Sequence, residues 1–365
     1  MKKKIFVALI IFFVLSSGSL LIYNFFFKEK TETKIEENKE KAEIKAISEK
    51  QAFAPFLENG QVKYYLAQNG HVVQSKFDGT QKKEISTTDL KDLKKVAWSP
   101  DGKKVIGFYG ETTGNGVKKS VFDYITKKSY PLDANIRSIA WSPDSKKIIY
   151  QYSDNQGNNN ISAANQDGSG WHNILQTRLG NLVVECPTPG KISLRSVPNS
   201  QTKGFLFVLE EKTENIVAVL DDLNGFSAKW SPDGQKILYQ TTNAKGQDLK
   251  LFVADSQGQN SLQLPAITLV EKCAWSANSQ KIFCAAPQNI SDNATWPEDW
   301  LDGLVSVKDD LYELSADGKE KTKIVASDEA RSFDVNEIIA SPQGDYVLFT
   351  SRRDGLLWSV AIPNN

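Results

Sequence analysis

The segment Trp-Ser-Pro-Asp-Gly-Lys-Lys at residues 98–104 recurs along most of the chain and restricts the folds that the chain can adopt. Each copy lies between two short apolar runs. Pro fixes φ at the second position of a turn, Ser and Asp side chains bond nearby backbone N–H groups, and Gly accepts a positive φ. The copies therefore predict β-hairpin turns. The turn residues of the four clearest copies are Trp98, Pro100, Asp101, Gly102, Trp141, Pro143, Asp144, Trp230, Pro232, Asp233, Gly234 and Trp275.

The spacing of the copies predicts a β-propeller. Trp98 and Trp141 are 43 positions apart, and Trp230 and Trp275 are 45 apart. Self-similarity at about 40 to 45 residues with short β-runs is typical of propeller blades. The 89 positions between Trp141 and Trp230 indicate a hidden copy, which we place at 195–200. A degenerate copy at Ala340 follows Trp275 by 65 positions, so one blade carries an insertion.

A second turn signal falls later in the repeats. Asp-Gly pairs occur at 78–79, 167–168 and 317–318, and a related turn occupies 255–258. Such pairs between alternating runs are strong hairpin signals. They predict the outer hairpin of each blade.

The two ends of the repeat region each show three strands without a complete repeat. The first set is predicted at 61–66, 71–77 and 82–86, and the last at 337–341, 345–351 and 356–362. With five interior repeats these partial blades predict seven blades closed by the chain ends. Six blades is the alternative if the first hairpin lies outside the ring.

The repeat over residues 96–351 resembles that of TolB-type propellers, whose WD-repeat-like blades carry the same turn before an apolar strand. Propellers of prolyl oligopeptidase relatives look similar. The resemblance implies an all-β propeller and a role in envelope protein assemblies. The Asp box of sialidases differs, because here Asp and Gly are adjacent.

The N-terminal region predicts a membrane anchor and a stalk. Residues 1–4 are a basic tail, and 5–27 form an uncharged apolar run long enough to cross a bilayer. We favour an uncleaved signal anchor over a cleaved signal peptide, because no A-x-A site follows the run. The short basic tail favours a cytoplasmic N-terminus, although lysines also follow the run. Residues 28–52 read as a charged linker, and 53–365 as the propeller.

Composition and motifs disfavour several functions. Lys plus Arg and Asp plus Glu are 44 each, so a nucleic-acid partner is not expected. His71 and His172 are the two histidines, and neither stands in a zinc motif. No nucleophile elbow, P-loop or dinucleotide fingerprint is present. We expect no cofactor, no metal and no enzymatic activity, and we expect the repeated Asp residues to be turn residues rather than ligands.

Two cysteines flank the fourth clear copy of the repeat. If Trp275 lies opposite Ile282, then Cys273 lies opposite Cys284 on the adjacent strand. This register and an extracytoplasmic location predict a cross-strand disulfide, with two reduced thiols as the alternative. Cys186 has no evident partner.

The insertion at 286–310 departs from the repeat and is the best candidate binding site. It combines two tryptophans with carboxylates, a composition suited to a cationic peptide or a sugar ring. The alternative is a lid whose tryptophans pack over a neighbouring blade. The candidate residues are Trp296, Glu298, Asp299, Trp300 and Asp302.

These features together predict a non-enzymatic, membrane-anchored propeller that binds an envelope protein or peptide at one face of the ring. The alternative is a propeller that binds or processes cell-surface glycan, with the insertion's carboxylates as acids and Trp296 or Trp300 as the stacking platform. Glycoside hydrolysis would require two carboxylates about 5 to 10 Å apart. The oligomeric state is left open.

Overall fold

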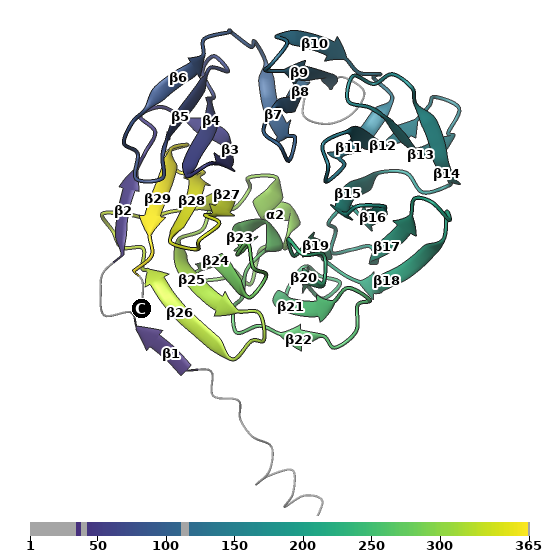
Figure 1. Cartoon of the computed structure of the whole chain (residues 1–365). Helices are drawn as coiled ribbons and strands as arrows, with labels where there is room; N and C mark the ends of the chain where they lie inside the picture. Colours follow the sequence, from purple (N-terminus) through teal and green to yellow (C-terminus); the bar gives the residue numbers. More distant parts are fainter. Residues whose placement is uncertain (1–33, 38–41, 111–116, 364–365) are drawn as a thin grey trace, which may run out of the picture. The chain divides into compact units, whose positions relative to one another are not determined.

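The computed structural model describes residues 34–37, 42–110 and 117–363. Residues 35–365 form one compact unit. Its strands build seven antiparallel sheets arranged around a common centre (Figure 1). The prediction of a seven-bladed, all-β propeller with four-stranded blades is thus confirmed.

The first four blades are formed by consecutive strands of the chain. Blade 1 contains β3 (Ala52–Glu58), β4 (Gln61–Leu66), β5 (Val72–Lys76) and β6 (Lys83–Ser86). Blade 2 contains β7 (Leu93–Trp98), β8 (Lys104–Tyr109), β9 (Lys118–Asp123) and β10 (Lys128–Pro131). Blade 3 contains β11 (Ile136–Trp141), β12 (Lys147–Ser153), β13 (Asn159–Asn165) and β14 (His172–Thr177). Blade 4 contains β15 (Leu182–Thr188), β16 (Lys191–Ser196), β17 (Gly204–Glu210) and β18 (Ile216–Leu223).

The remaining blades include the strands from the N-terminal side. Blade 5 contains β19 (Ser227–Trp230), β20 (Lys236–Thr241), β21 (Lys250–Asp255) and β22 (Leu262–Gln263). Blade 6 contains β23 (Cys273–Trp275), β24 (Lys281–Pro287), β25 (Asp309–Ser315) and β26 (Glu320–Val325), and β1 (Lys34–Glu37) adds a fifth strand beside β26. Blade 7 contains β27 (Val335–Ala340), β28 (Tyr346–Ser351), β29 (Leu357–Ala361) and β2 (Glu43–Ala46). The described residues also form two short helices, η2 (Val270–Lys272) and α2 (Glu298–Leu301).

The repeated turn joins the first and second strands of a blade, as its residue types predict. In blade 2 the backbone N–H of Ser99 donates to the carbonyl of Lys104 at 2.9 Å. Asp101 accepts hydrogen bonds from the Ser99 hydroxyl at 2.7 Å and from the N–H of Lys103 at 3.2 Å. Gly102 has a φ of 66°, a conformation that side chains with a Cβ disfavour. The motif is therefore a self-contained turn whose carboxylate satisfies local donors.

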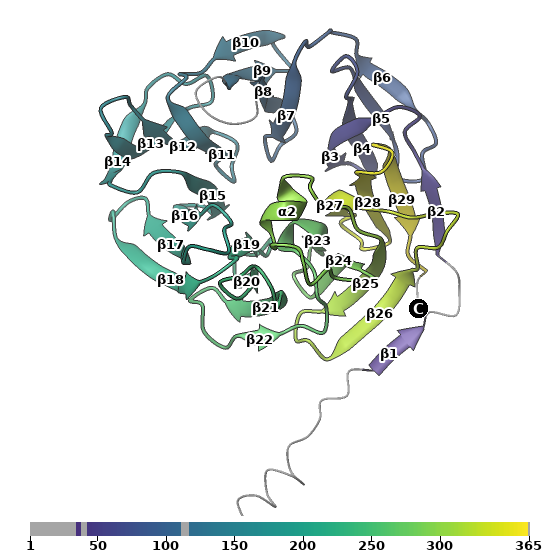
Figure 2. The same cartoon turned by 180° about the vertical axis from the view of Figure 1, so that it is seen from behind.

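The closing strand comes from the segment that the sequence analysis assigns to the stalk. Residues 43–46 form β2, which pairs with β29 in the register Glu43 to Ala361 and Ala46 to Trp358. The backbone N–H of Ile47 continues this contact by donating to the carbonyl of Leu357 at 2.8 Å. The propeller therefore begins before Phe53, and the ring closes with an outermost strand, on the rim (Figure 2). In the sequence, β2 resembles a linker because it is short and charged. Its role as a strand depends on pairing with β29 of blade 7.

The hidden copy of the repeat lies earlier than predicted. The first hairpin of blade 4 turns between Thr188 and Lys191, whereas residues 195–200 end β16 and begin the next loop. Gly190, with a φ of 79°, closes this turn. Cys186 stands 45 positions after Trp141 and 44 before Trp230, so a cysteine occupies the place of the repeat tryptophan. Without Trp and Asp, this copy carries too little of the motif to be recognised.

The hydrophobic core consists of layers between neighbouring blades. One layer combines Ile106 and Val121 of blade 2 with Trp141 and Ile148 of blade 3. Blade faces can be buried in this way only against the next blade, which is why the stability of the unit depends on the whole ring.

The predicted membrane anchor at 5–27 lies outside the described residues. In the part of the chain that the structure describes, no helix has the length and apolar character needed to span a bilayer.

Candidate functional site: the central channel

A cavity of about 420 Å³ lies at the centre of the ring, where the first strands of the blades meet. Its lining comes from β3, β7, β15, β19 and β27, together with one residue of β16 and with η2, which leads into β23, so strands of five blades and the entry to a sixth contribute. First strands supply most of these side chains because they are the innermost strands of the blades (Figure 1). The charged lining residues are Glu185, Arg195, Lys229, Glu271 and Glu337.

The charges on one side of the channel are only partly compensated. The Arg195 Nε and Glu185 Oε2 atoms lie 3.7 Å apart, an ion pair without a hydrogen bond. The Oε1 atom of Glu271 accepts a hydrogen bond from the Ser227 hydroxyl at 2.6 Å. Among the described residues, Glu185 Oε2, Arg195 Nε and Glu271 Oε2 are buried without a hydrogen-bond partner. Buried polar atoms of this kind cost free energy unless they are paired, so these three can gain from a polar ligand.

Two further channel residues have pKa values shifted by burial. Burial raises the pKa of Glu337, and the hydrogen bond that its Oε2 accepts from the Ala54 N–H at 2.7 Å offsets only part of this rise. Burial lowers the pKa of Lys229, against the opposing charges of Glu271 and Glu185. The Lys229 ammonium donates to the carbonyl of Cys273. The channel thus presents acids and bases from different blades in one partly desolvated space.

The insertion forms a strap across loops of other blades, and its tryptophans are core residues. Trp296 and Trp300 are each 1% exposed and pack with Leu249 and Leu269. This burial corrects the expectation of an aromatic platform, because neither ring can stack on a ligand. Their packing agrees with the alternative interpretation, in which the insertion is a lid whose tryptophans pack over a neighbouring blade.

The carboxylates of the strap have different environments. Glu298 Oε1 accepts hydrogen bonds from the backbone N–H of Ser200 at 2.6 Å and from its hydroxyl at 2.8 Å. Asp299 Oδ2 accepts from the Thr295 N–H at 2.7 Å. These two carboxylates therefore hold the strap to blade 4 and to itself. Asp302 is exposed beside Leu304, so it is the one predicted site residue whose side chain faces solvent.

A buried cluster of ion pairs contacts the strap. Lys272, adjacent to Glu271, donates to Asp309 Oδ2 at 2.7 Å and to Asp334 Oδ1 at 2.8 Å. Trp300 Nε1 also donates to Asp334 Oδ1, at 2.9 Å. Burial raises the pKa of Asp309. At Asp334 burial acts in the same direction, but the Lys272 charge and these hydrogen bonds hold its pKa below the usual value. The cluster joins η2, the strap and the segment before β27, next to the channel.

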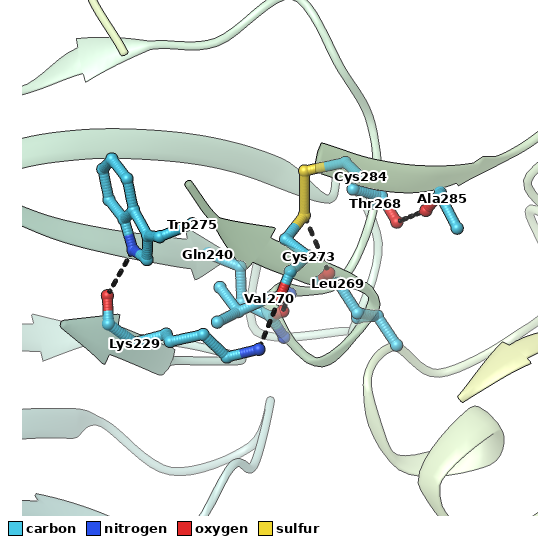
Figure 3. The surroundings of a disulfide bond; sticks show 9 residues. All are labelled: Lys229, Gln240, Thr268, Leu269, Val270, Cys273, Trp275, Cys284 and Ala285. Carbon is cyan, nitrogen blue, oxygen red and sulfur yellow. Dashed lines mark hydrogen bonds between the residues drawn. A yellow bond between two sulfur atoms is a disulfide. The ribbon is translucent and has the colours of Figure 1, made fainter. Parts of the chain in front are cut away.

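The cysteine pair lies beside the channel wall. Cys273 pairs with Cys284 across β23 and β24, in the register that the sequence analysis expects, and their sulfurs are bonded (Figure 3). In the same view Lys229 reaches the carbonyl of Cys273, and Trp275 Nε1 donates to the carbonyl of Lys229 at 3.3 Å. Cys186 has a free thiol, and burial raises its pKa to about 12.

No group of three His, Cys, Asp or Glu side chains that could hold a metal occurs among the described residues.

Sequence reasoning missed the channel residues altogether. Glu185, Lys229 and Glu337 each interrupt a short apolar run that precedes a repeat turn. A charged residue in the first strand of a blade is the signal that could have found them.

Comparisons with known proteins identify the fold. No protein-family model matches the chain, and no curated protein sequence is similar to it. Two oligogalacturonate lyase structures are similar at 12% identity and a TM-score of 0.64. The match to the structure in complex with manganese covers 88% of this chain and 94% of the lyase chain. The match to the structure from Vibrio parahaemolyticus covers 91% of this chain and 97% of the lyase chain.

Two further structures match the propeller. The propeller domain of the Trilobed protease from Pyrococcus furiosus is 14% identical, with a TM-score of 0.56 over 85% of this chain and 92% of its own. TolB from Acinetobacter baumannii is 17% identical, with a TM-score of 0.49 over 72% of this chain and 62% of its own. At such identities the similarity to the lyase and Trilobed protease structures shows the fold alone, a β-propeller, and the seven sheets of this chain give the number of blades.

Proposed function

We propose that this protein is a membrane-anchored scaffold of the cell envelope, which binds a peptide segment of a partner protein in the central channel. The observation that carries the proposal is the set of buried polar atoms without a hydrogen-bond partner on Glu185, Arg195 and Glu271 in one cavity. A ligand with both donors and acceptors would satisfy them.

The chemistry of the channel favours a peptide over a simple ion. The lining carries three acidic and two basic side chains, so neither a small anion nor a small cation matches the whole surface. A peptide carries backbone N–H and C=O groups and can present both charge signs. The cavity volume of about 420 Å³ lies in the range that encloses ligands of a few residues. Asp302 and Leu304, exposed on the strap, offer a second contact outside the cavity.

The proposed extracytoplasmic location depends on two independent features. The apolar run at 5–27 has the length of a bilayer span and follows a short basic tail. The bond between Cys273 and Cys284 is of a kind that persists in oxidising compartments.

Site-specific photo-crosslinking in the full chain tests the proposal. A benzophenone amino acid replaces Asn336, which lines the channel, or Lys212, which is exposed in the turn between β17 and β18. Irradiation of whole cells is expected to give a discrete protein adduct from Asn336 and none from Lys212. The double variant Glu185→Gln, Glu271→Gln should reduce the adduct about tenfold, because it removes two charge-assisted hydrogen-bond acceptors.

Glu329→Gln, at an exposed position, is the matched control and should leave the adduct unchanged. Thermal melting of each variant checks that the fold is intact. Equal adducts from both positions, or an adduct that survives the double substitution, would rule out channel binding.

A further inference from the structure

A second cavity, of about 300 Å³, lies on the side of the ring between blades 2 and 3. Its floor consists of Ile148 and Tyr150 on β12, both buried. One wall is the end of β10 and the two residues after it, 131–133, and the other is formed by β13 and by the loop before β14. The strand of blade 2 that borders the cavity, β10, spans four residues. The cavity is separate from the central channel in both position and lining.

The cavity combines aromatic surfaces with hydrogen-bonding groups of both kinds. Tyr150, Tyr152 and Trp171 supply the rings. The Ser162 hydroxyl donates to Asn173 Oδ1 at 2.8 Å, which leaves the amide NH₂ of Asn173 as a donor. The Tyr152 hydroxyl accepts a hydrogen bond from Asn135 Nδ2 at 3.1 Å and retains its own proton to donate.

Trp171 is the exposed member of this set. Its side chain is 65% exposed, whereas the tryptophans of the strap are 1% exposed. The loop that carries it is held by Asp167, which accepts hydrogen bonds from the N–H and the hydroxyl of Ser169 at 3.0 and 2.7 Å. Trp171 therefore holds a large apolar ring at the rim of the cavity, where a ligand in the cavity can contact it.

We propose that this cavity binds a neutral sugar residue of a glycan. The apolar face of a pyranose can stack on an aromatic ring, and its hydroxyl groups need both donors and acceptors. Amides and hydroxyls line the interior, and the exposed carboxylates of Asp133 and Asp167 lie at the edge.

The lining also argues against charged ligands. The described residues that line it include no Lys, Arg or His, so a phosphate or an acidic sugar would meet two carboxylates and no cation from them. A quaternary ammonium group would suit the rings and carboxylates, but it has no acceptor for the amide and hydroxyl donors. The neutral sugar is the ligand that uses every type of group present.

Calorimetric titration of the full chain in detergent tests this proposal. The probes are maltotriose, cellotriose and chitotriose, with trigalacturonic acid and choline as charged comparisons. At least one neutral trisaccharide is expected to bind, and neither charged compound should. Trp171→Ala should weaken that binding about tenfold, the loss expected when a stacking ring is removed.

The control variant is Ile125→Ala, whose side chain is 70% exposed outside the cavity lining and which should bind as the wild type does. Because Trp171 is exposed, its substitution should leave thermal melting unchanged. Failure of all three neutral sugars to bind at millimolar concentration overturns the proposal. So does binding of choline or trigalacturonic acid alone, or sugar binding that Trp171→Ala does not alter.

Discussion

At the scale of single residues, the repeat tryptophans connect one blade to the next. Trp98, Trp141 and Trp275 each donate their indole N–H to a carbonyl in the first strand of the preceding blade, at 2.9 to 3.3 Å. Trp230 reaches the Ser193 hydroxyl on β16 instead, at 3.0 Å. The repeat tryptophans therefore both pack in the layers between blades and donate a hydrogen bond to the preceding blade.

Removing the indole N–H of Trp141 should destabilise the ring even when an aromatic ring is kept. Trp141→Phe removes the hydrogen bond to the carbonyl of Ala97, which costs about 0.5–1.5 kcal/mol. Trp141→Ala also opens a cavity and should cost about 3–5 kcal/mol. Urea denaturation followed by circular dichroism measures both changes. Trp171→Ala is the matched control, expected within about 0.5 kcal/mol of the wild type because its ring is exposed; equal losses at the two positions would contradict this account.

At the scale of elements, the hairpin turns were the most predictable part of the molecule. Turn residues depend on local φ and on hydrogen bonds within a few residues, so the Asp-Gly signals at 78–79, 167–168 and 317–318 mark observed turns between third and fourth strands. Blade 4 escaped recognition because Cys186 replaces tryptophan and the turn at 188–191 lacks Asp. The strap was recognised as an insertion, but its burial depends on loops of other blades.

The turn aspartates should make stability depend on pH at the acid end. Hydrogen bonds from the Ser142 hydroxyl and the Lys146 N–H lower the pKa of Asp144, and Asp317 has the same arrangement with Ser315 and Lys319. A lowered folded pKa stabilises the protein above the unfolded pKa of about 3.9, and this contribution is lost as the pH falls through the folded value.

The measurement compares urea midpoints of the wild type and of Asp144→Asn, Asp317→Asn between pH 7 and pH 2. The wild type should be the more stable protein at neutral pH, and its advantage should shrink below about pH 4 as the pH falls through the folded pKa values. The comparison cancels the opposite contribution of Asp309 and Glu337, whose raised pKa values favour the folded state as the pH falls. A constant difference across the range would refute the assignment.

At the scale of the whole molecule, the ring is closed by β2, a strand that precedes blade 1 in sequence and completes blade 7. The contact continues past the strand, since Ile47 is 2% exposed and Ser48 Oγ accepts a hydrogen bond from the Leu357 N–H at 2.8 Å. Closure matters because each blade buries its face only against a neighbour, so an open ring leaves two faces in solvent.

Truncation tests the closure directly. The fragment 53–365 lacks β2 and residues 47–48, whereas 42–365 keeps them. The shorter fragment is expected to unfold at a lower urea concentration and with a broader transition, because blades 1 and 7 lose the strand that joins them. Identical transitions in the two fragments would show that β2 is dispensable. Fragments for binding studies should accordingly begin at or before residue 42.

The sequence by itself determined the blade architecture, because turn chemistry and strand alternation act within a few residues and repeat at a fixed interval. It also placed Cys273 opposite Cys284, since one hairpin register sets both. Only the tertiary structure decided which side chains face the channel, which tryptophans are buried and where the ring closes. Those outcomes depend on contacts between residues far apart in the chain, such as Glu298 with Ser200 and Ala46 with Trp358, for which no local pattern exists.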